Sequence, residues 1–292
     1  MKECKSSISD PYHYYRKKPR QVYKAKLGCE DVLVKEIGNS ELRMETTRTQ
    51  VAEKLLRDKI RIPDIICTDT VRKRLVLEFI PDSETLDDRI ERLYKDGKCN
   101  DIEELLEQLA EVLTNIHKSP VPMKKRDLNS NRNFTGIGTI LDRDIDTIKN
   151  GFKDLEEQLE RARKFALENI KQKDDVLSHG DFKPNNILIS EENQIAVVDW
   201  FEFGIAVRQL DLGSVLLFLE EPQRRCFVDR YISKMDLDEN CEILEKTSLI
   251  IAGIIHSAGV ANLCRNYENC SDKWCKLQAE IFDRFKGVLD SL

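Results

Sequence analysis

One segment of the chain, residues 176–213, constrains the fold more than any other. Its polar residues follow a distinctive spacing: His179, Gly180, Asp181, Asn186 and Asp199. Two short apolar runs separated by a polar turn predict an antiparallel hairpin that begins at Asn186 and ends at Asp199. Such a hairpin would bring an amide oxygen and a carboxylate to one place, and these are ligands that Mg²⁺ accepts. The segment therefore predicts a hairpin that brings Asn186 and Asp199 together, with Asp181 close by.

The pattern H-x-D-x-x-x-x-N, followed by two apolar residues and Asp, resembles the catalytic and metal-binding loops of the protein-kinase-like superfamily. The glycine after His179, the Asp-Trp pair at Asp199 and the sequence Leu-Asp-Leu-Gly at 210–213 are similar to its aminoglycoside and choline phosphotransferase branch. The resemblance implies an α+β fold with two lobes, a small antiparallel sheet with one helix followed by a larger helical part. It also implies a kinase that uses ATP and Mg²⁺. A polar turn on an unrelated α+β protein could carry His-Gly-Asp alone, but the register of the later residues favours the kinase interpretation.

The same resemblance assigns roles in phosphoryl transfer, a reaction that depends on positioning and on neutralising charge that spreads over several oxygens. Asp181 would orient the acceptor hydroxyl and take its proton. Asn186 and Asp199 would bind Mg²⁺, and Lys183 would reach the γ-phosphate. Two residues would brace the loop through hydrogen bonds rather than react: His179 and Asp211.

The first 81 residues predict the small sheet. Strand-forming runs lie at 22–26, 32–37, 65–67 and 74–80, and a helical pattern covers 41–59. After Pro81 the pattern becomes helical, mainly over 101–118, 142–171 and 210–292. We therefore expect an N-terminal nucleotide-binding lobe over 1–81 and a C-terminal catalytic and acceptor-binding lobe over 82–292, with a ligand cleft between them.

Lys35 ends one of the predicted strands, where the family places a lysine that binds the α- and β-phosphates. The family pairs this lysine with a helix glutamate, and two residues compete for that role. Glu53 borders the apolar side of the predicted helix, whereas Glu45 lies within it, where an unpaired charge would be costly. We favour Glu53 and expect Glu45 to be a surface residue.

The resemblance also places an adenine site. The backbone carbonyl of Glu78 and the amide of Ile80 would bind the adenine edge, and three apolar side chains would sandwich the ring: Leu33, Leu188 and Val198. All three are equally explicable as core residues. No glycine triplet precedes Lys35, so the cover of the triphosphate is undefined, and Gly136-Ile137-Gly138 reads as a turn rather than a phosphate loop.

The composition and the apolar runs of the chain indicate where in the cell such an enzyme would be found. With 40% hydrophobic and 34% charged residues the chain is typical of soluble globular proteins. The most apolar run, 249–261, is too short to span a membrane and predicts a buried helix. Residues 1–10 contain no apolar run, so we expect no secretory signal. Nine cysteines without a C-x-x-C pair indicate free buried thiols rather than a zinc site. We therefore expect a cytoplasmic protein without membrane association.

The acceptor is less well defined. By resemblance it would lie against 142–171 and 210–292. Residues 176–292 contain 19 Asp and Glu and 12 Lys and Arg, a net charge of −7, which would suit a cationic acceptor, although a solvated acidic surface explains it too. Glu202 could contact such an acceptor or be a solvated loop residue. The sequence does not indicate the oligomeric state.

Three functions are consistent with these observations. The first is a kinase for a small-molecule hydroxyl, such as an amino-alcohol, a sugar or an aminoglycoside. The second is an atypical kinase acting on protein or linked to RNA, to which Arg48-Thr49 and the basic residues at 16–20 bear a faint similarity, although a nucleic-acid partner is not favoured. The third is a nucleotide-binding pseudokinase, which would be expected to lack Asp181, Asn186 or Asp199; all three are present.

Overall fold

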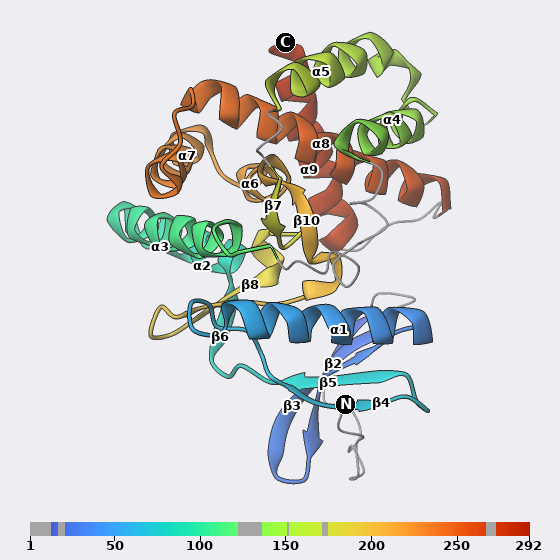
Figure 1. Ribbon diagram of the computed structural model, residues 1–292, viewed down its shortest axis with the longest axis vertical. Coiled ribbons are helices and arrows are strands. Elements are labelled where there is room, and N and C mark those ends of the chain that lie inside the picture. Colours follow the sequence, from blue (N-terminus) through green and yellow to red (C-terminus); the bar gives the residue numbers. More distant parts are fainter. Residues whose placement is uncertain (1–12, 17–20, 122–135, 151, 171–174, 267–272) are drawn as a thin grey trace.

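The computed structural model describes residues 13–16, 21–121, 136–150, 152–170, 175–266 and 273–292. Its architecture is α+β, as predicted, with a small antiparallel sheet near the N-terminus and a mostly helical remainder (Figure 1). The sheet has the strand order β1-β2-β3-β5-β4, and every neighbouring pair is antiparallel. Its strands are β1 (His13–Arg16), β2 (Gln21–Leu27), β3 (Glu30–Glu36), β4 (Ile65–Asp69) and β5 (Arg74–Glu78).

Helix α1 (Asn39–Leu56) lies lengthwise between this sheet and the helical part of the molecule (Figure 1). It begins where the Glu41 side chain accepts a hydrogen bond of 3.2 Å from the Gly38 amide, which satisfies a free N–H at the helix start. Its buried residues recur every three or four positions, as expected for one helical face. They include Leu42, Glu45, Thr49, Ala52 and Leu56.

The helical part contains two small sheets. One has the order β6-β8-β9 and the other pairs β7 with β10. The strands are β6 (Ser83–Thr85), β7 (Asp175–Ser178), β8 (Ile187–Ser190), β9 (Ile195–Val197) and β10 (Gly204–Val207). The α-helices are α2 (Leu86–Lys95), α3 (Cys99–His117), α4 (Gly136–Lys149), α5 (Glu156–Asn169), α6 (Arg208–Leu216), α7 (Glu221–Met235), α8 (Cys241–Asn266) and α9 (Lys273–Asp290).

The predicted boundary after residue 81 falls between β5, which belongs to the first sheet, and β6, which pairs with β8. The chain therefore passes from one sheet to the other in this segment. The division into lobes at 81 stays a prediction.

The helical stretch expected at 142–171 consists of two separate helices, α4 and α5, with the short 3₁₀ helix η2 (Lys153–Leu155) directly before α5. One expectation about the middle of the chain is wrong. Residues 136–138 open α4 instead of forming a turn; Gly136 itself has a φ of 71°. The leucine and isoleucine side chains that follow, among them Ile140 and Leu141, are buried and hold the whole helix in place.

Helix α8 packs on α4, α5, α6, α7 and α9, and the burial of most described residues from 249 to 258 confirms the predicted core helix. Ile250, Ile251 and Ile254 are fully buried, and each such side chain stabilises the fold by about 1.5–3 kcal/mol. Helix α6 packs so closely on α8 that a Cβ at Gly213 would lie 2.0 Å from the Ser248 carbonyl oxygen. Glycine is therefore the residue that fits at this point.

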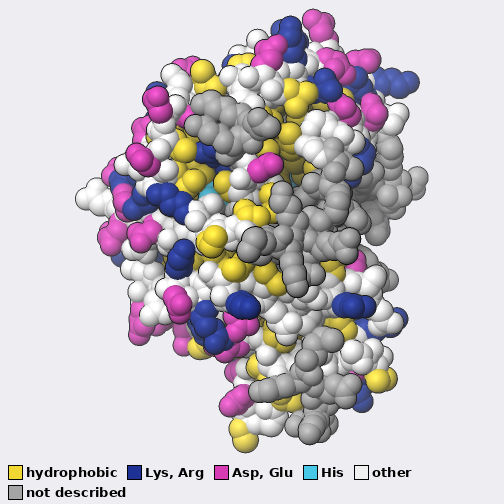
Figure 2. All heavy atoms as spheres, viewed as in Figure 1, with side chains coloured by type: hydrophobic (Ala, Val, Ile, Leu, Met, Phe, Trp, Pro, Cys, Tyr) yellow, Lys and Arg dark blue, Asp and Glu magenta, His cyan; other side chains and the backbone are white. Residues whose placement is uncertain are grey.

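The surface fits the high content of charged residues. Figure 2 shows side chains of both charge signs around the edges of one face, with hydrophobic side chains gathered nearer its middle. No helix among the described residues is both long and apolar enough to cross a membrane.

The cysteines differ from the expectation of free buried thiols. Cys67 in β4 is disulfide-bonded. Cys29, Cys99, Cys226 and Cys241 are free, but the first two are exposed and the other two are only half-buried.

Candidate active site

A cleft of about 1820 Å³ runs between the first sheet and the helical part. One end is lined by Lys35, Glu45, Asn186 and Asp199, together with Lys183. Residues from β3, from α1, from the segment just before β8 and from the segment just after β9 thus meet in one place, although they are far apart in the sequence.

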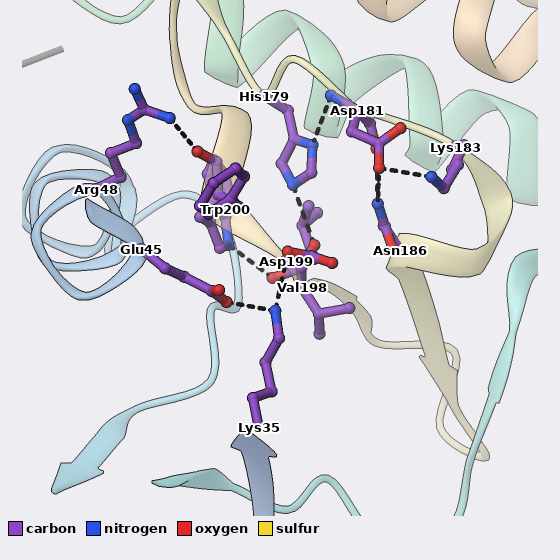
Figure 3. Close-up of polar contacts among 12 residues, drawn as sticks. Lys35, Glu45, Arg48, His179, Asp181, Lys183, Asn186, Val198, Asp199 and Trp200 are labelled. Carbon is purple, nitrogen blue, oxygen red and sulfur yellow. Dashed lines mark hydrogen bonds and ion pairs between the residues drawn. The ribbon is translucent and has the colours of Figure 1, made fainter. Parts of the chain in front are cut away.

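Lys35 is the centre of this end of the cleft (Figure 3). It lies near the end of β3, is 5% exposed, and its Nζ forms an ion pair with Glu45 and one of 3.0 Å with Asp199 Oδ1. Burial alone would lower the pKa of the Lys35 ammonium, but Asp199 and Glu45 outweigh it and raise the pKa. The lysine is therefore firmly charged and held between two carboxylates.

The preference for Glu53 as the partner of Lys35 is wrong. Glu53 points away from Lys35 and pairs with Arg57 at the surface, four residues along the chain. Glu45 is 1% exposed and carries the ion pair. A charge at the buried position of Glu45 seemed costly from the sequence. That face of α1 is turned to the cleft, and Glu45 therefore meets Lys35 there.

Asp199 follows β9 in a left-handed backbone conformation, with φ of 65° and ψ of 62°. Its side chain remains 34% exposed towards the cleft. Burial raises the pKa of its carboxyl, but Lys35 outweighs this effect, with smaller contributions from Lys183 and His179, and the pKa falls to about 2. Asp199 is thus an ionised carboxylate that a cation in the cleft can reach.

Asp181 and Asn186 face each other across the loop between β7 and β8 (Figure 3). Asn186 Nδ2 donates to the backbone carbonyl oxygen of Asp181 at 2.9 Å and to the carboxylate oxygen Oδ2 of Asp181 at 3.0 Å. Lys183 Nζ donates to the same Oδ2 at 2.6 Å. Since the amide nitrogen of Asn186 is turned to Asp181, its amide oxygen is the atom left for a cation. The backbone amide of Val198 donates to the Asn186 carbonyl at 2.9 Å, which places Asn186 beside the start of the Asp199 loop.

His179 joins these two loops. Its Nδ1 accepts from the Asp181 amide at 3.3 Å, and its Nε2 lies 3.1 Å from the Val198 carbonyl. The ring is fully buried and packs edge-on against Trp200, with centroids 4.6 Å apart. His179 thus links the two loops by hydrogen bonds, and its bracing role in the reaction stays a prediction.

Asp211 supports the same loop from behind. Its carboxylate accepts from the amides of His179 and Gly180, both at 2.8 Å, and from His117 Nε2 at 3.2 Å. Burial raises the pKa of Asp211, but the hydrogen bond and charge of His117 contribute to lowering it below its ordinary value. Gly180 has a φ of 82°, and a Cβ there would lie 2.5 Å from the Glu202 carbonyl oxygen. The glycine is therefore required by the backbone.

The residues expected around the adenine line the rest of the cleft. Leu33, Leu188 and Val198 all face it, and so do Glu78 and Ile80. The Glu78 side chain itself is turned to Arg61 and to the Asp64 amide, the latter at 3.2 Å.

Comparisons with known proteins identify the family of the chain. Residues 39–235 match the phosphotransferase enzyme family, APH, over more than half of the chain. The chain belongs to this family. It is therefore a kinase-type phosphotransferase, and the predicted resemblance and fold are confirmed. A comparison with curated proteins gives no significant match.

Solved structures with the same fold include a choline kinase and aminoglycoside phosphotransferases. Choline kinase LicA from Streptococcus pneumoniae has a TM-score of 0.64 at 18% identity, with 93% of this chain and 90% of that chain covered. A thermostable mutant of aminoglycoside phosphotransferase APH(4)-Ia has a TM-score of 0.69 at 14% identity, with 98% and 95% covered. ADP-bound aminoglycoside phosphotransferase APH(2'')-Ib has a TM-score of 0.64 at 12% identity, with 98% and 94% covered.

Some site residues of this phosphotransferase were not found from the sequence. Trp200 donates its indole N–H to the Val197 carbonyl at 2.9 Å and packs against His179. His117 joins Asp211 to the Tyr231 hydroxyl, 2.6 Å from its Nδ1. His117 lies in a helical pattern far from the motif, so no local signal identified it. Arg48 contacts the backbone carbonyl of Phe201.

Glu45 and Glu53, both on α1, give a matched test of the role expected for Lys35. Glu45→Gln is expected to lower kcat/KM for ATP by about tenfold or more, because a misplaced positioning group costs up to about 100-fold. Glu53→Gln, on the same helix but at the surface, should leave it unchanged. Steady-state kinetics on both variants decides the assignment, and a loss confined to Glu53→Gln would reverse it.

Proposed function

We propose that this enzyme transfers the γ-phosphoryl group of ATP to a hydroxyl of a small molecule, with Mg²⁺ as cofactor. The observation that carries the proposal is the meeting of Lys35, Asn186 and Asp199 at one end of the cleft, with Asp181 immediately beside them. These groups offer one cation for phosphates, two oxygen donors for a metal and one carboxylate for an acceptor.

The residues fit a magnesium site. Asp199 presents an ionised carboxylate, and the orientation of the Asn186 amide leaves its oxygen for a metal. Mg²⁺ takes few protein ligands when phosphates and waters supply the others. When bound, it would neutralise charge on the β- and γ-phosphates. Lys35 would hold the α- and β-phosphates, with Glu45 fixing its direction.

Asp181 is placed to act as the general base. Its carboxylate would orient the acceptor hydroxyl and take its proton as the oxygen attacks phosphorus. Lys183, now 2.6 Å from Asp181 Oδ2, would turn to the γ-phosphate. His179 and Asp211 would keep the loop in place without taking part in the proton transfer.

ATP is our choice of donor because Leu33, Leu188 and Val198 line the cleft as expected for an adenine sandwich, with the backbone of Glu78 and Ile80 along its edge. Related structures support a nucleotide here: choline kinase LicA is described in complex with AMP, APH(2'')-Ib with ADP, and aminoglycoside 2'-phosphotransferase-IIIa with GDP. ATP in preference to GTP is therefore a prediction to test.

The acceptor we propose is an amino-alcohol, a sugar or an aminoglycoside, in line with the names of the structural neighbours. The acidic second half of the chain supports a cationic acceptor. Glu202 is one of the acidic residues in this half of the chain. Its charge also favours the charged form of the Arg48 guanidinium, whose pKa it raises. A protein-directed or RNA-linked kinase is the alternative, and a cytoplasmic location remains a prediction.

Release of ADP tests the proposal. The enzyme is incubated with MgATP or MgGTP and a panel of choline, ethanolamine, sugars and aminoglycosides, with ADP or GDP quantified. We expect turnover with at least one small hydroxylated amine and faster reaction with ATP. Labelling of the protein by radioactive ATP without any added acceptor, and no turnover with the panel, would favour the alternative.

A further inference from the structure

Arg48 is a buried cation that no step of the proposed reaction uses. It lies on α1, one turn after Glu45, and is 3% exposed. Burial lowers the pKa of its guanidinium, and the charge of Glu202 opposes this effect. A buried charge is expensive unless something offsets it, so its position calls for an explanation.

The contacts of Arg48 all lie on one short segment. This is η5 (Trp200–Glu202), the single 3₁₀ turn that directly follows Asp199. The guanidinium donates to the backbone carbonyl of Phe201 and lies 5.8 Å from the centre of its ring (Figure 3). Helix α1 packs directly against this segment.

The same segment touches the catalytic loop on its other side. Trp200 packs on His179, and the backbone of Glu202 lies against Gly180. The turn η5 is thus enclosed between α1 and the loop of Asp181. Helix α1 therefore reaches the Asp199 loop twice, through Glu45 and Lys35 on one side and through Arg48 on the other.

We propose that Arg48 is a positioning residue that fixes the turn after Asp199, and through it the direction of the Asp199 carboxylate towards Mg²⁺. Asp199 holds a left-handed conformation, which is costly for a residue with a side chain and persists only where the surroundings enforce it. Arg48 supplies part of that constraint from the buried side. The inference rests on the metal-binding role proposed for Asp199.

Binding experiments can separate this role from a general effect on stability. The Kd of ADP is measured by calorimetry with and without Mg²⁺. The Kd without Mg²⁺ divided by the Kd with Mg²⁺ is the factor by which Mg²⁺ strengthens ADP binding, called here the Mg²⁺ advantage. In Arg48→Met this advantage is expected to fall by about tenfold or more, the usual effect of losing a group that orients a metal ligand. The Kd without Mg²⁺ should stay close to the wild-type value. Arg43→Met, at an exposed position of the same helix, should behave as wild type.

Hydrogen exchange in the protein without metal and nucleotide provides a readout independent of activity. The backbone amide of Phe203 donates to the Trp200 carbonyl at 3.1 Å and should exchange faster in Arg48→Met. The exchange rate of the Val198 amide, which donates to the Asn186 carbonyl in the hairpin, should not change. If Arg48→Met fails to fold, the same measurements are made on Arg48→Lys. A lysine cannot contact both the carbonyl and the ring of Phe201 as a guanidinium does.

An unchanged Mg²⁺ advantage in a folded Arg48 variant would overturn the inference, and so would equal losses with and without Mg²⁺. The outcome is distinguishable from a failure of the proposed function. If Asp199→Ala loses Mg²⁺-dependent binding while the Arg48 variants keep it, only the role of Arg48 is refuted.

Discussion

Replacing Asp199 by alanine is expected to abolish Mg²⁺-dependent nucleotide binding and to lower turnover by at least about 100-fold, the scale seen when a group that stabilises transition-state charge is removed. The variant loses an anionic ligand and also one of the two carboxylates that hold Lys35. Because the pKa of Asp199 is about 2, the wild-type carboxylate is ionised at every ordinary assay pH. The metal dependence should therefore not titrate with this group.

Calorimetric titration with MgADP, together with ADP-release kinetics, measures this loss. Asp58→Ala is a suitable control because Asp58 is exposed just after α1, away from the cleft residues. Thermal unfolding of both variants shows whether the fold is kept. Wild-type Mg²⁺ dependence in a folded Asp199→Ala enzyme would refute the metal-binding role.

Asp181→Asn is expected to separate binding from chemistry. The amide keeps the shape of the side chain but cannot accept the proton of the acceptor hydroxyl, so kcat should fall by about 100-fold or more. The Kd of MgADP should stay near the wild-type value, because Asp181 is assigned to the acceptor and not to the metal. Single-turnover kinetics with saturating MgATP measures the transfer step directly.

The matched control is Asp175→Asn, at an exposed position at the start of β7, the strand that leads into the same loop. It should retain full activity. If Asp181→Asn transferred phosphate at the wild-type rate, the base would have to be another group. A loss of MgADP affinity equal to the loss of kcat would instead place Asp181 at the metal.

The sequence predicted the catalytic loops well because their geometry is mostly local. Asp181 and Asn186 are five residues apart, and a short hairpin with only one register carries Asn186 to Asp199. Four of the five strands of the first sheet were also found, since alternating apolar residues and turn signals are short-range patterns. Strand β1 (His13–Arg16) was not predicted.

The partner of Lys35 could not be chosen in the same way. An apolar face of a helix indicates only that the face is buried, not what it meets. Glu45 looked unfavourable because its compensating charge, Lys35, comes from β3. The buried position of Glu45, between apolar residues of the same helix, was itself the signal, and it would have pointed to the correct glutamate.

Arg48 and His117 show the same limit over longer distances. Arg48 acts on a residue 153 positions away and His117 on one 94 positions away. Such contacts arise from how α1 and α3 pack on the loops, which no spacing in the sequence records. The acceptor is undefined for a related reason, since its site depends on how α4 to α9 are arranged.

The central claim is that the carboxylate of Asp199 and the amide of Asn186 hold one nucleotide-bound Mg²⁺, with Asp181 beside the γ-phosphate. A crystal structure with Mg²⁺ and a non-hydrolysable ATP analogue tests it most directly. We expect an oxygen of Asp199 and the Asn186 amide oxygen at about 2.0–2.1 Å from the metal, with the triphosphate along Lys35. A nucleotide bound outside the cleft, or a metal held by other residues, would contradict the account.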